Sequence, residues 1–358
     1  MTRAAFYSPL KPPGHPVPSG DRAMARALVQ ALAGAGIAAE VASTLQSRDP
    51  SGDPDAQARL MEIAASEVAR LIPEGRAAGW RFWLTYHNYY KAPDLIGPGV
   101  SAALDIPYLL VEATRARKRL GGPWDAFAKA AEAATEKADT VFYLTEHDAE
   151  ALRAYAPDGQ RLVHLRPFLA RTDMPPCTTR QNGILAVGMF RAGDKTASYQ
   201  LIAEALGQLG TKDWSLGIAG DGVEAAKVRR MMQGFNDRVR FLGALDAEQM
   251  QAAYGRCSLL FWPGVNEAFG MTYIEAQAAG LPVVAQDRPG VRDVLSPDAA
   301  YPSVEGGAKA LAARLDLLLS MPKLTQHLGM SARDYVARHH LMSGAEKTLA
   351  QAIAEVTA

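Results

Sequence analysis

The chain has 358 residues, 48% of them hydrophobic and 21% charged, which is long for one core and comfortable for two domains. Lysine plus arginine equals aspartate plus glutamate, at 38 each, so the basic excess typical of a nucleic-acid-binding protein is missing. No apolar run reaches the ~20 residues of a membrane span, and the N-terminus lacks the apolar core of a signal peptide. We expect a cytoplasmic protein, with peripheral attachment at the inner membrane face left open.

The cysteines and histidines give no metal-binding pattern. Cys177 and Cys257 are far apart and form no CxxC motif, and the seven histidines have no HExxH spacing. We therefore expect free thiols, no metal ion and no bound cofactor.

The first half of the chain alternates apolar strand patterns with amphipathic helical patterns. A strand at 3–9 leads into a loop rich in proline and glycine, and a helix follows at 21–36. Further strands are predicted at 37–43, 81–87, 107–113 and 140–146. This alternation is typical of a parallel, doubly wound sheet, whose ligands bind at the carboxyl ends of the strands.

Residues 167–182 combine prolines with polar residues and are predicted to link two domains. After them the strand and helix pattern restarts, and the predicted strands are 183–188, 214–220, 239–244, 258–263 and 282–286. The fold class is therefore α/β, with two doubly wound, Rossmann-like domains that face each other across a cleft. Their predicted bounds are 1–170 and 171–340, and a C-terminal helix at 341–358 could pack back on the first domain.

Two glutamates flank the start of the helix predicted after the 258–263 strand, in "NEAFGMTYIEAQAAGLPVVA". Glu267 lies in the loop, where backbone N–H groups and the helix dipole favour an anion. Glu275 shares a helix face with Met271 and two alanines, so its carboxylate would be partly desolvated. The alternative is a glutamate that is merely exposed on the helix or salt-bridged to a neighbour. Amides for a phosphate beside carboxylates for hydroxyls suit a sugar nucleotide.

This stretch closely resembles the donor signature of the retaining family 4 glycosyltransferases, which have the GT-B fold. The resemblance covers the whole second domain and implies that it binds a nucleoside diphosphate sugar as co-substrate. It implies that Glu275 binds the ribose hydroxyls and that Glu267 holds a sugar hydroxyl. The sugar and diphosphate would meet the segment formed by Phe269, Gly270, Met271 and Thr272. The loops "IAGDG" and "VRFLGAL" resemble the family's nucleotide-side loops, which contribute Asp221 and Gly243.

The chain departs from the family after the first strand of this domain. The family usually has a Gly-Arg pair there, followed by a lysine, and together these hold the diphosphate. This chain reads "VGMFRAGDKTAS", with Met189 where the arginine is expected. Arg191 and Lys195 could supply the positive charge that a leaving diphosphate needs without a metal. The alternative is that both are solvated loop cations.

In the first domain, "PVPSGDRAMARAL" resembles the family's small-residue loop, where Gly20 lets the backbone approach the donor phosphates and the acceptor. Asp21 could be only the N-cap of the following helix. The family often has a histidine at the strand end where this chain has Glu112, which could bind a hydroxyl or pair with the "RARKR" arginine cluster after it. His87, at another strand end, is either a second polar site residue or a structural histidine.

The resemblance implies a metal-independent hexosyltransferase that retains the anomeric configuration. The acceptor is unknown, and if the arginine cluster faces the cleft, an anionic or membrane-linked acceptor becomes plausible. The catalytic candidates are Glu267, Lys195, Arg191 and Glu112. The alternatives are a catalytically silent GT-B partner subunit and a GT-B sugar-nucleotide epimerase or phosphorylase.

Overall fold

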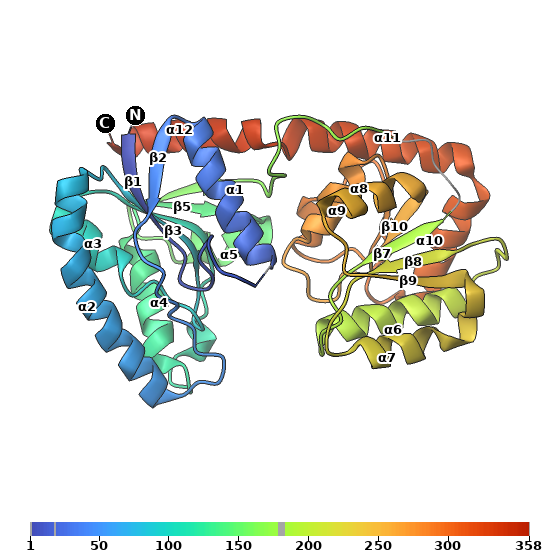
Figure 1. Ribbon diagram of the computed structural model, residues 1–358, viewed down its shortest axis with the longest axis horizontal. Coiled ribbons are helices and arrows are strands. Elements are labelled where there is room, and N and C mark those ends of the chain that lie inside the picture. The colour runs from blue at the N-terminus through green and yellow to red at the C-terminus, as the bar shows by residue number, and fades with distance from the viewer. Residues whose placement is uncertain (1, 18, 178–182, 358) are drawn as a thin grey trace. The chain divides into compact units, whose positions relative to one another are not determined.

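The computed structural model describes residues 2–17, 19–177 and 183–357, so part of the predicted linker lies outside the described residues. The chain divides into two compact units. The first domain comprises Met1–Ala170 with Met342–Ala358, and the second comprises Arg171–Leu341. Figure 1 shows each of them as a sheet with its helices.

The first domain is built on a six-stranded sheet in the order β2-β1-β3-β4-β5-β6. All of its pairings are parallel. The strands are β1 (Thr2–Tyr7), β2 (Ile37–Val41), β3 (Trp83–Asn88), β4 (Tyr108–Ala113), β5 (Thr140–Tyr143) and β6 (Arg161–His164). The central strands are almost completely buried, as expected for a parallel sheet with helices on both faces.

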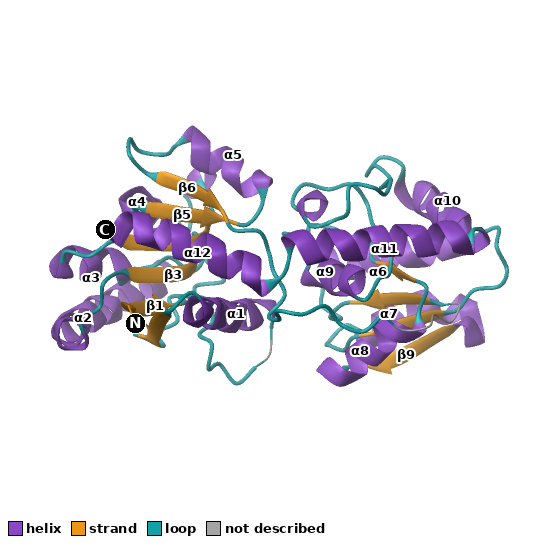
Figure 2. Cartoon of the chain, turned by 90° about the horizontal axis from the view of Figure 1, so that it is seen from above, coloured by secondary structure: helices purple, strands orange, loops and turns teal. Residues whose placement is uncertain are grey.

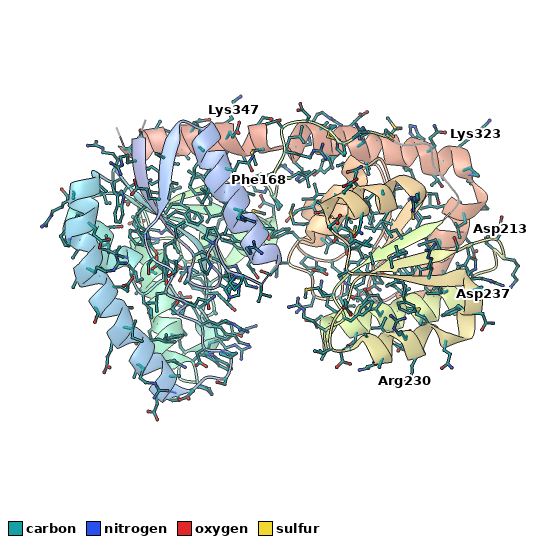
Figure 3. All side chains as sticks on the ribbon, viewed as in Figure 1. Phe168, Asp213, Arg230, Asp237, Lys323 and Lys347 are labelled. Atoms are coloured by element: carbon teal, nitrogen blue, oxygen red, sulfur yellow. The ribbon has the colours of Figure 1, made fainter. Side chains whose placement is uncertain are left out.

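The helices of the first domain follow the strands in alternation. They are α1 (Gly20–Gly34), α2 (Pro54–Ala78), α3 (Gly97–Leu104), the 3₁₀ turn η1 (Arg117–Arg119), α4 (Asp125–Lys137), α5 (Glu146–Ala154) and the C-terminal α12 (Met342–Thr357). The last helix, α12, packs against α1. Phe168 is buried in this domain, whereas Lys347 on α12 points outward (Figure 3).

The second domain has a five-stranded parallel sheet in the order β11-β10-β7-β8-β9. Its strands are β7 (Ile184–Val187), β8 (Leu216–Ala219), β9 (Val239–Gly243), β10 (Leu259–Phe261) and β11 (Val283–Val284). Its helices are α6 (Asp194–Gly207), α7 (Ala225–Met232), η2 (Gln233–Arg238), α8 (Ala247–Arg256), α9 (Met271–Ala278), η3 (Val291–Asp293), α10 (Gly307–Ser320) and α11 (Pro322–His339). α6 and α7 cover one face, and α8 and α9 the other (Figures 1 and 2).

The predicted fold class, two doubly wound parallel sheets, is confirmed. Both strand orders contain a switch point, where consecutive connections leave a central strand in opposite directions. In the first sheet it lies between β1 and β3, and in the second between β7 and β10. Ligands of such sheets bind outside the carboxyl ends of the strands at this point. The two switch points are therefore the places at which a ligand of either domain is expected.

Candidate functional site

The switch point of the second domain brings together two segments that are far apart in the sequence. β7 ends at Val187 and leads through a loop into α6, whose first turn carries Lys195. The neighbouring β10 ends at Phe261 and leads through Trp262 into the loop that contains Glu267. Lys195 Nζ donates to Glu267 Oε1 and forms an ion pair with it.

The indole of Trp262 completes this polar centre. Its Nε1 donates to the same Glu267 oxygen at 2.9 Å, and the Lys195 ammonium lies 5.3 Å from the Trp262 ring centroid, within cation–π range. Both members of the ion pair are only partly exposed, at 23% and 16%. One carboxylate oxygen thus accepts two hydrogen bonds, and the lysine charge is held at the carboxyl end of the central strands.

Two contacts fix the Glu267 loop to the first turns of α6. The Asn266 amide donates to Asp194 Oδ2 at 2.9 Å, and the Val265 N–H donates to Ser198 Oγ at 3.1 Å. Asn266 itself has a φ of 51°, a left-handed conformation that asparagine tolerates better than most residues. Contacts within the protein therefore hold the loop in one geometry before any ligand binds.

Glu275 lies on α9, which follows this loop, and its hydrogen-bond partner is Tyr254 of α8 in the same domain. The Tyr254 hydroxyl donates to Glu275 Oε2 at 2.8 Å. Burial raises the pKa of Glu275, although the Tyr254 hydrogen bond works in the opposite direction. Glu275 is partly buried, so the exposed alternative is wrong, and among the described residues its side chain bonds to a tyrosine and forms no salt bridge.

The segment 269–272 forms the entry to α9. Gly270 is the N-cap residue with φ 78°, and no side chain caps the helix there. A Cβ at Gly270 would lie 2.7 Å from the Tyr273 ring, so its own packing also requires glycine. Phe269, Met271 and Thr272 are partly exposed around it. The first N–H groups of α9 are thus free of side-chain caps, which is the arrangement that favours anions.

The other predicted residues of this domain lie in neighbouring loops at the same sheet edge. The Asp221 carbonyl accepts from the Phe190 N–H at 2.9 Å, and the Gly243 carbonyl accepts from the Gly220 N–H at 2.8 Å. These bonds tie the loops after β7, β8 and β9 to one another. Arg191 is exposed, and its backbone N–H donates to the Met189 carbonyl at 3.0 Å.

The switch point of the first domain holds a second polar cluster. His87 at the end of β3 lies opposite Glu112 at the end of β4, because Tyr86 pairs with Val111 in the parallel register. His87 Nδ1 is 3.4 Å from Glu112 Oε2 and 4.0 Å from Asp21 Oδ1. Both of the first two atoms are buried without a hydrogen-bond partner within the described residues.

The backbone at these two strand ends is strained. His87 has φ 71° and Glu112 has φ 59°, and the left-handed region costs a non-glycine residue about 1–2 kcal/mol. Strain of this kind persists at sites where a side chain must be aimed in one direction. Histidine is among the residues enriched in this region, whereas glutamate is not, so the unusual backbone is most telling at Glu112; a binding role for the pair stays a prediction.

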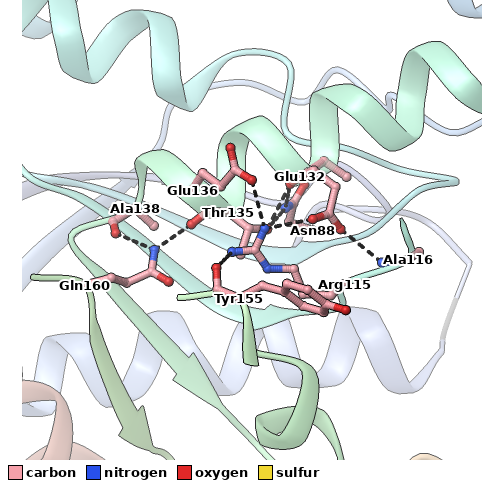
Figure 4. A network of polar contacts seen from close by, with 10 residues as sticks. Asn88, Arg115, Ala116, Glu132, Thr135, Glu136, Ala138, Tyr155 and Gln160 are labelled. Atoms are coloured by element: carbon pink, nitrogen blue, oxygen red, sulfur yellow. Dashed lines mark hydrogen bonds and ion pairs between the residues drawn. The ribbon is translucent and has the colours of Figure 1, made fainter. Parts of the chain in front are cut away.

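Two alternatives for the first domain are corrected here. The N-cap of α1 is Ser19, whose side chain accepts from the Arg22 N–H, so Asp21 is not the cap, and α1 begins at Gly20. Arg115, the first residue of the arginine cluster, is buried and pairs with Glu132 at 2.8 Å (Figure 4). Arg115 therefore has a structural role, and Glu112 faces His87.

These geometries are accompanied by sequence similarity in the second domain. Residues 180–335 match the family of glycosyl transferases group 1. A GDP-mannose-dependent alpha-mannosyltransferase of Mycolicibacterium smegmatis is 36% identical over 85 residues, 24% of this chain and 22% of that protein. A D-inositol 3-phosphate glycosyltransferase of Corynebacterium diphtheriae is 31% identical over 115 residues, 32% of this chain and 27% of that protein. The match thus spans about a quarter of the length of these relatives.

Solved glycosyltransferase structures share the fold over nearly the whole chain. Sucrose-phosphate synthase from Thermosynechococcus elongatus has a TM-score of 0.73 at 20% identity and covers 99% of both chains. The Anabaena protein HepE in complex with UDP also has a TM-score of 0.73, at 13% identity, and covers 99% of this chain and 100% of its own. The chain therefore has the GT-B fold of these glycosyltransferases.

Two residues of the glycosyltransferase-like domain were not predicted from the sequence. Trp262 and Tyr254 each donate to one of the two glutamates. The sequence did contain a signal for Trp262, because its indole N–H stands at the polar end of an apolar strand. The structure adds that Gly188 leaves room for this ring, since a Cβ at Gly188 would lie 2.6 Å from it.

The described residues hold no group of three or more His, Cys, Asp and Glu side chains suited to a metal ion. Among the same residues, no helix is both long and apolar enough to cross a membrane. Cys177 and Cys257 are free thiols in the structure.

Glu112→Gln is expected to lower the pKa of His87. Burial by itself lowers this pKa, but the negative charges of Glu112 and of nearby aspartates outweigh burial and raise it above the ordinary value. The folded state therefore holds the proton of His87 more tightly than the unfolded state. Protonated His87 stabilises the fold below pH ~6.5, and this contribution is lost as the pH rises through the folded-state pKa. An NMR titration of the imidazole measures the shift, and Glu150→Gln, an exposed change in α5, is the control. An unchanged His87 pKa in Glu112→Gln would contradict the pairing.

Proposed function

We propose that the protein is a retaining, metal-independent glycosyltransferase that moves a hexose from a nucleoside diphosphate sugar to an acceptor hydroxyl. The observation that carries this proposal is the Lys195–Glu267 ion pair at the switch point of the second domain. It puts a cation for a diphosphate next to a carboxylate for a sugar hydroxyl. The GT-B fold and the family match over residues 180–335 support the same reaction class.

The donor would bind at the carboxyl edge of the second sheet. Lys195 and the uncapped N–H groups of α9 would neutralise the diphosphate, while Glu267 accepts a hydrogen bond from the sugar. Glu275, oriented by Tyr254, would accept from a ribose hydroxyl through the oxygen that Tyr254 leaves free. The loops of Asp221 and Gly243 would lie beside the nucleoside.

In the proposed reaction the bond between the sugar C1 and the diphosphate oxygen breaks, and a bond forms between C1 and the acceptor oxygen. The acceptor proton passes to the leaving diphosphate. No side-chain nucleophile is needed, so catalysis consists of charge stabilisation and positioning. In this scheme Glu112 and His87 of the first domain bind the acceptor hydroxyls, and Gly20 allows close backbone approach. A cytoplasmic enzyme with such a site would meet both soluble acceptors and acceptors at the inner membrane face.

The test is a thermal-shift panel with UDP, GDP, ADP and CMP and their common sugar conjugates, with and without a chelator. A ligand at about 100 times its Kd adds roughly 2.7 kcal/mol of stability. We expect one nucleoside diphosphate to give a clear shift that the chelator does not change. A shift that disappears with the chelator would contradict metal independence.

No thermal shift with any of these nucleotides or sugar nucleotides would favour the alternative of a catalytically silent GT-B subunit. The observation in its favour is Met189, 46% exposed at the position where the family has an arginine. Conversion of the sugar nucleotide without an acceptor would instead indicate an epimerase, and dependence on inorganic phosphate a phosphorylase.

Glu275→Ala is expected to weaken binding of the shifting nucleotide by about 10- to 100-fold, since a hydrogen bond to a charged group is worth ~1.5–3 kcal/mol. Tyr254→Phe keeps the carboxylate but removes the group that orients it, so a smaller loss is expected. Titration calorimetry with the ribonucleotide and its 2′-deoxy analogue measures both. Equal affinities of folded Glu275→Ala and the wild type would exclude the ribose role.

A further inference from the structure

Aromatic and cationic side chains gather beside the His87–Glu112 pair in the first domain. We call this group the aromatic–cationic shelf, and it consists of Tyr89, Tyr90, Lys91, Arg119 and Trp124. Tyr89–Lys91 directly follow β3, Arg119 lies in η1 after β4, and Trp124 precedes α4. The shelf therefore lies at the same carboxyl edge of the sheet as the strained strand ends.

The rings of the shelf form a continuous row that begins at His87. The centroid distances are 4.8 Å from His87 to Tyr89, 5.6 Å from Tyr89 to Tyr90 and 5.5 Å from Tyr90 to Trp124. All three shelf rings are partly exposed. Such rings offer an apolar surface with polar edges, on which a sugar ring can pack.

Two cations lie over the far end of this row. Lys91 Nζ is 5.2 Å from the Trp124 centroid and 5.7 Å from that of Tyr90. The Arg119 guanidinium carbon is 4.9 Å from the Tyr90 centroid and 5.9 Å from that of Trp124. Among the residues that the structure describes, Lys91 and Arg119 have no ion-pair partner, and the carboxylate of Asp125, next to Trp124 in the sequence, pairs with Lys129 at 2.6 Å. The two shelf cations can therefore meet an external anion.

The shelf is held by hydrogen bonds to the loop that contains Asp49. Trp124 Nε1 donates to the Asp49 carbonyl at 3.0 Å, and the Asp49 N–H donates to the Lys91 carbonyl at 2.9 Å. The Asp49 carboxylate is itself buried and accepts from Gln57 at 2.8 Å and from the N–H groups of its own turn. Three loops are thus locked together, which is the support that a binding surface needs to keep its geometry.

The charge changes sign along the row. At the His87 end stand the carboxylates of Glu112 and Asp21, and at the Trp124 end stand Lys91 and Arg119. A ligand that fits this gradient has hydroxyls at one end, a sugar ring in the middle and an anion at the other.

We propose that the aromatic–cationic shelf binds an anionic group, such as a phosphate or a carboxylate, that the acceptor carries next to a sugar or polyol ring. Lys91 and Arg119 bind the anion, and Tyr90 and Trp124 pack on the ring. The acceptor role of this ligand rests on the proposed function, whereas its binding to the shelf does not. The predicted arginine cluster thus contributes one anion ligand, Arg119, while Arg115 belongs to the core.

The test follows the fluorescence of Trp124 without any donor present. Glucose 6-phosphate, glucuronate and neutral glucose are titrated at constant ionic strength, and Trp124→Phe identifies the part of the signal that comes from the shelf. We expect saturable binding of a charged sugar and at least tenfold weaker binding of glucose. Equal responses to charged and neutral sugars, or no saturable response to any of them or to the vesicles below, would overturn the proposal.

The variant Lys91→Gln/Arg119→Gln should lose this binding by at least tenfold. Arg117→Gln is the matched control, because Arg117 lies in the same 3₁₀ turn but over Tyr155, 4.4 Å from its centroid and off the shelf. Charged-sugar binding that survives in the double variant would also overturn the proposal.

Sedimentation with phosphatidylglycerol vesicles, against neutral phosphatidylcholine vesicles, distinguishes the source of the anion. Binding that depends on Lys91 and Arg119 assigns it to a lipid headgroup, and binding of the sugars alone assigns it to a soluble saccharide. Because no donor is present in these assays, a protein that fails the nucleotide panel can still pass them. Failure of the proposed function and failure of the shelf are therefore separate results.

Discussion

Lys195→Ala is expected to lower the turnover number for sugar transfer by about 10²–10³-fold, or ~2.7–4 kcal/mol of transition-state stabilisation. The variant removes the cation that would neutralise the leaving diphosphate. In the wild type the Glu267 carboxylate accepts hydrogen bonds from Lys195 and Trp262. Without the lysine, its negative charge would face the diphosphate uncompensated. Initial rates with the donor identified by the thermal-shift panel measure the effect.

The matched control is Lys227→Ala, since Lys227 is a half-exposed lysine of the same domain that lies 4.0 Å from Glu224. Arg191→Ala is compared in parallel. A large loss in Arg191→Ala with little change in Lys195→Ala would transfer the diphosphate role to Arg191. A loss confined to KM in Lys195→Ala would mean that the lysine binds the donor equally in the ground state and the transition state.

The fold was predictable because each domain repeats one simple unit. Apolar strand patterns alternate with helical ones, and that alternation permits few topologies besides a parallel, doubly wound sheet. Two elements were not predicted from the sequence. β6 (Arg161–His164) has only four residues, all half-buried, so it lacks the apolar run of a central strand. α2 (Pro54–Ala78) buries few of its side chains and contains Pro73, which obscures its periodicity.

Local sequence patterns allowed individual candidate residues to be proposed, but not the contacts between them. Glu267, Gly270 and Glu275 belong to one loop and helix, and their spacing carries the resemblance. The partners of the glutamates depend on the sheet order and on helix packing. Lys195 meets Glu267 because β7 lies beside β10, although two other strands separate them in the chain.

The first domain illustrates the same limit. His87 faces Glu112 because β3 and β4 pair in one particular register, which no local pattern specifies. Their left-handed backbones are equally invisible in the sequence, since both residues usually avoid that region. The tertiary structure places Glu112 beside His87 and not beside the arginine cluster, so the structural pairing with the arginines is excluded, and the binding of a hydroxyl stays a prediction.

Gly290→Ala is expected to displace the Glu267 loop and to impair both stability and activity. Gly290 has φ 79°, and a Cβ there would lie 1.9 Å from the Ala268 carbonyl oxygen. This sparsely populated conformation costs an alanine about 1–3 kcal/mol, and backbone displacement by overpacking adds typically ~1–3 kcal/mol. Since Ala268 follows Glu267 directly, the shift would move the carboxylate away from Lys195, and a misplacement of ~1 Å can cost about 10²-fold in rate.

Denaturant unfolding and initial rates of the same preparation separate the two effects, because a folded but misaligned protein keeps its unfolding cooperativity while losing turnover. Gly207→Ala is the control in the same domain. Gly207 ends α6, it has no positive φ, and nothing lies within 4 Å of the added Cβ, so its replacement should leave both quantities close to wild type. Wild-type stability and turnover in Gly290→Ala would show that the loop can move without consequence, and the geometry of Glu267 would then lose its place in the mechanism.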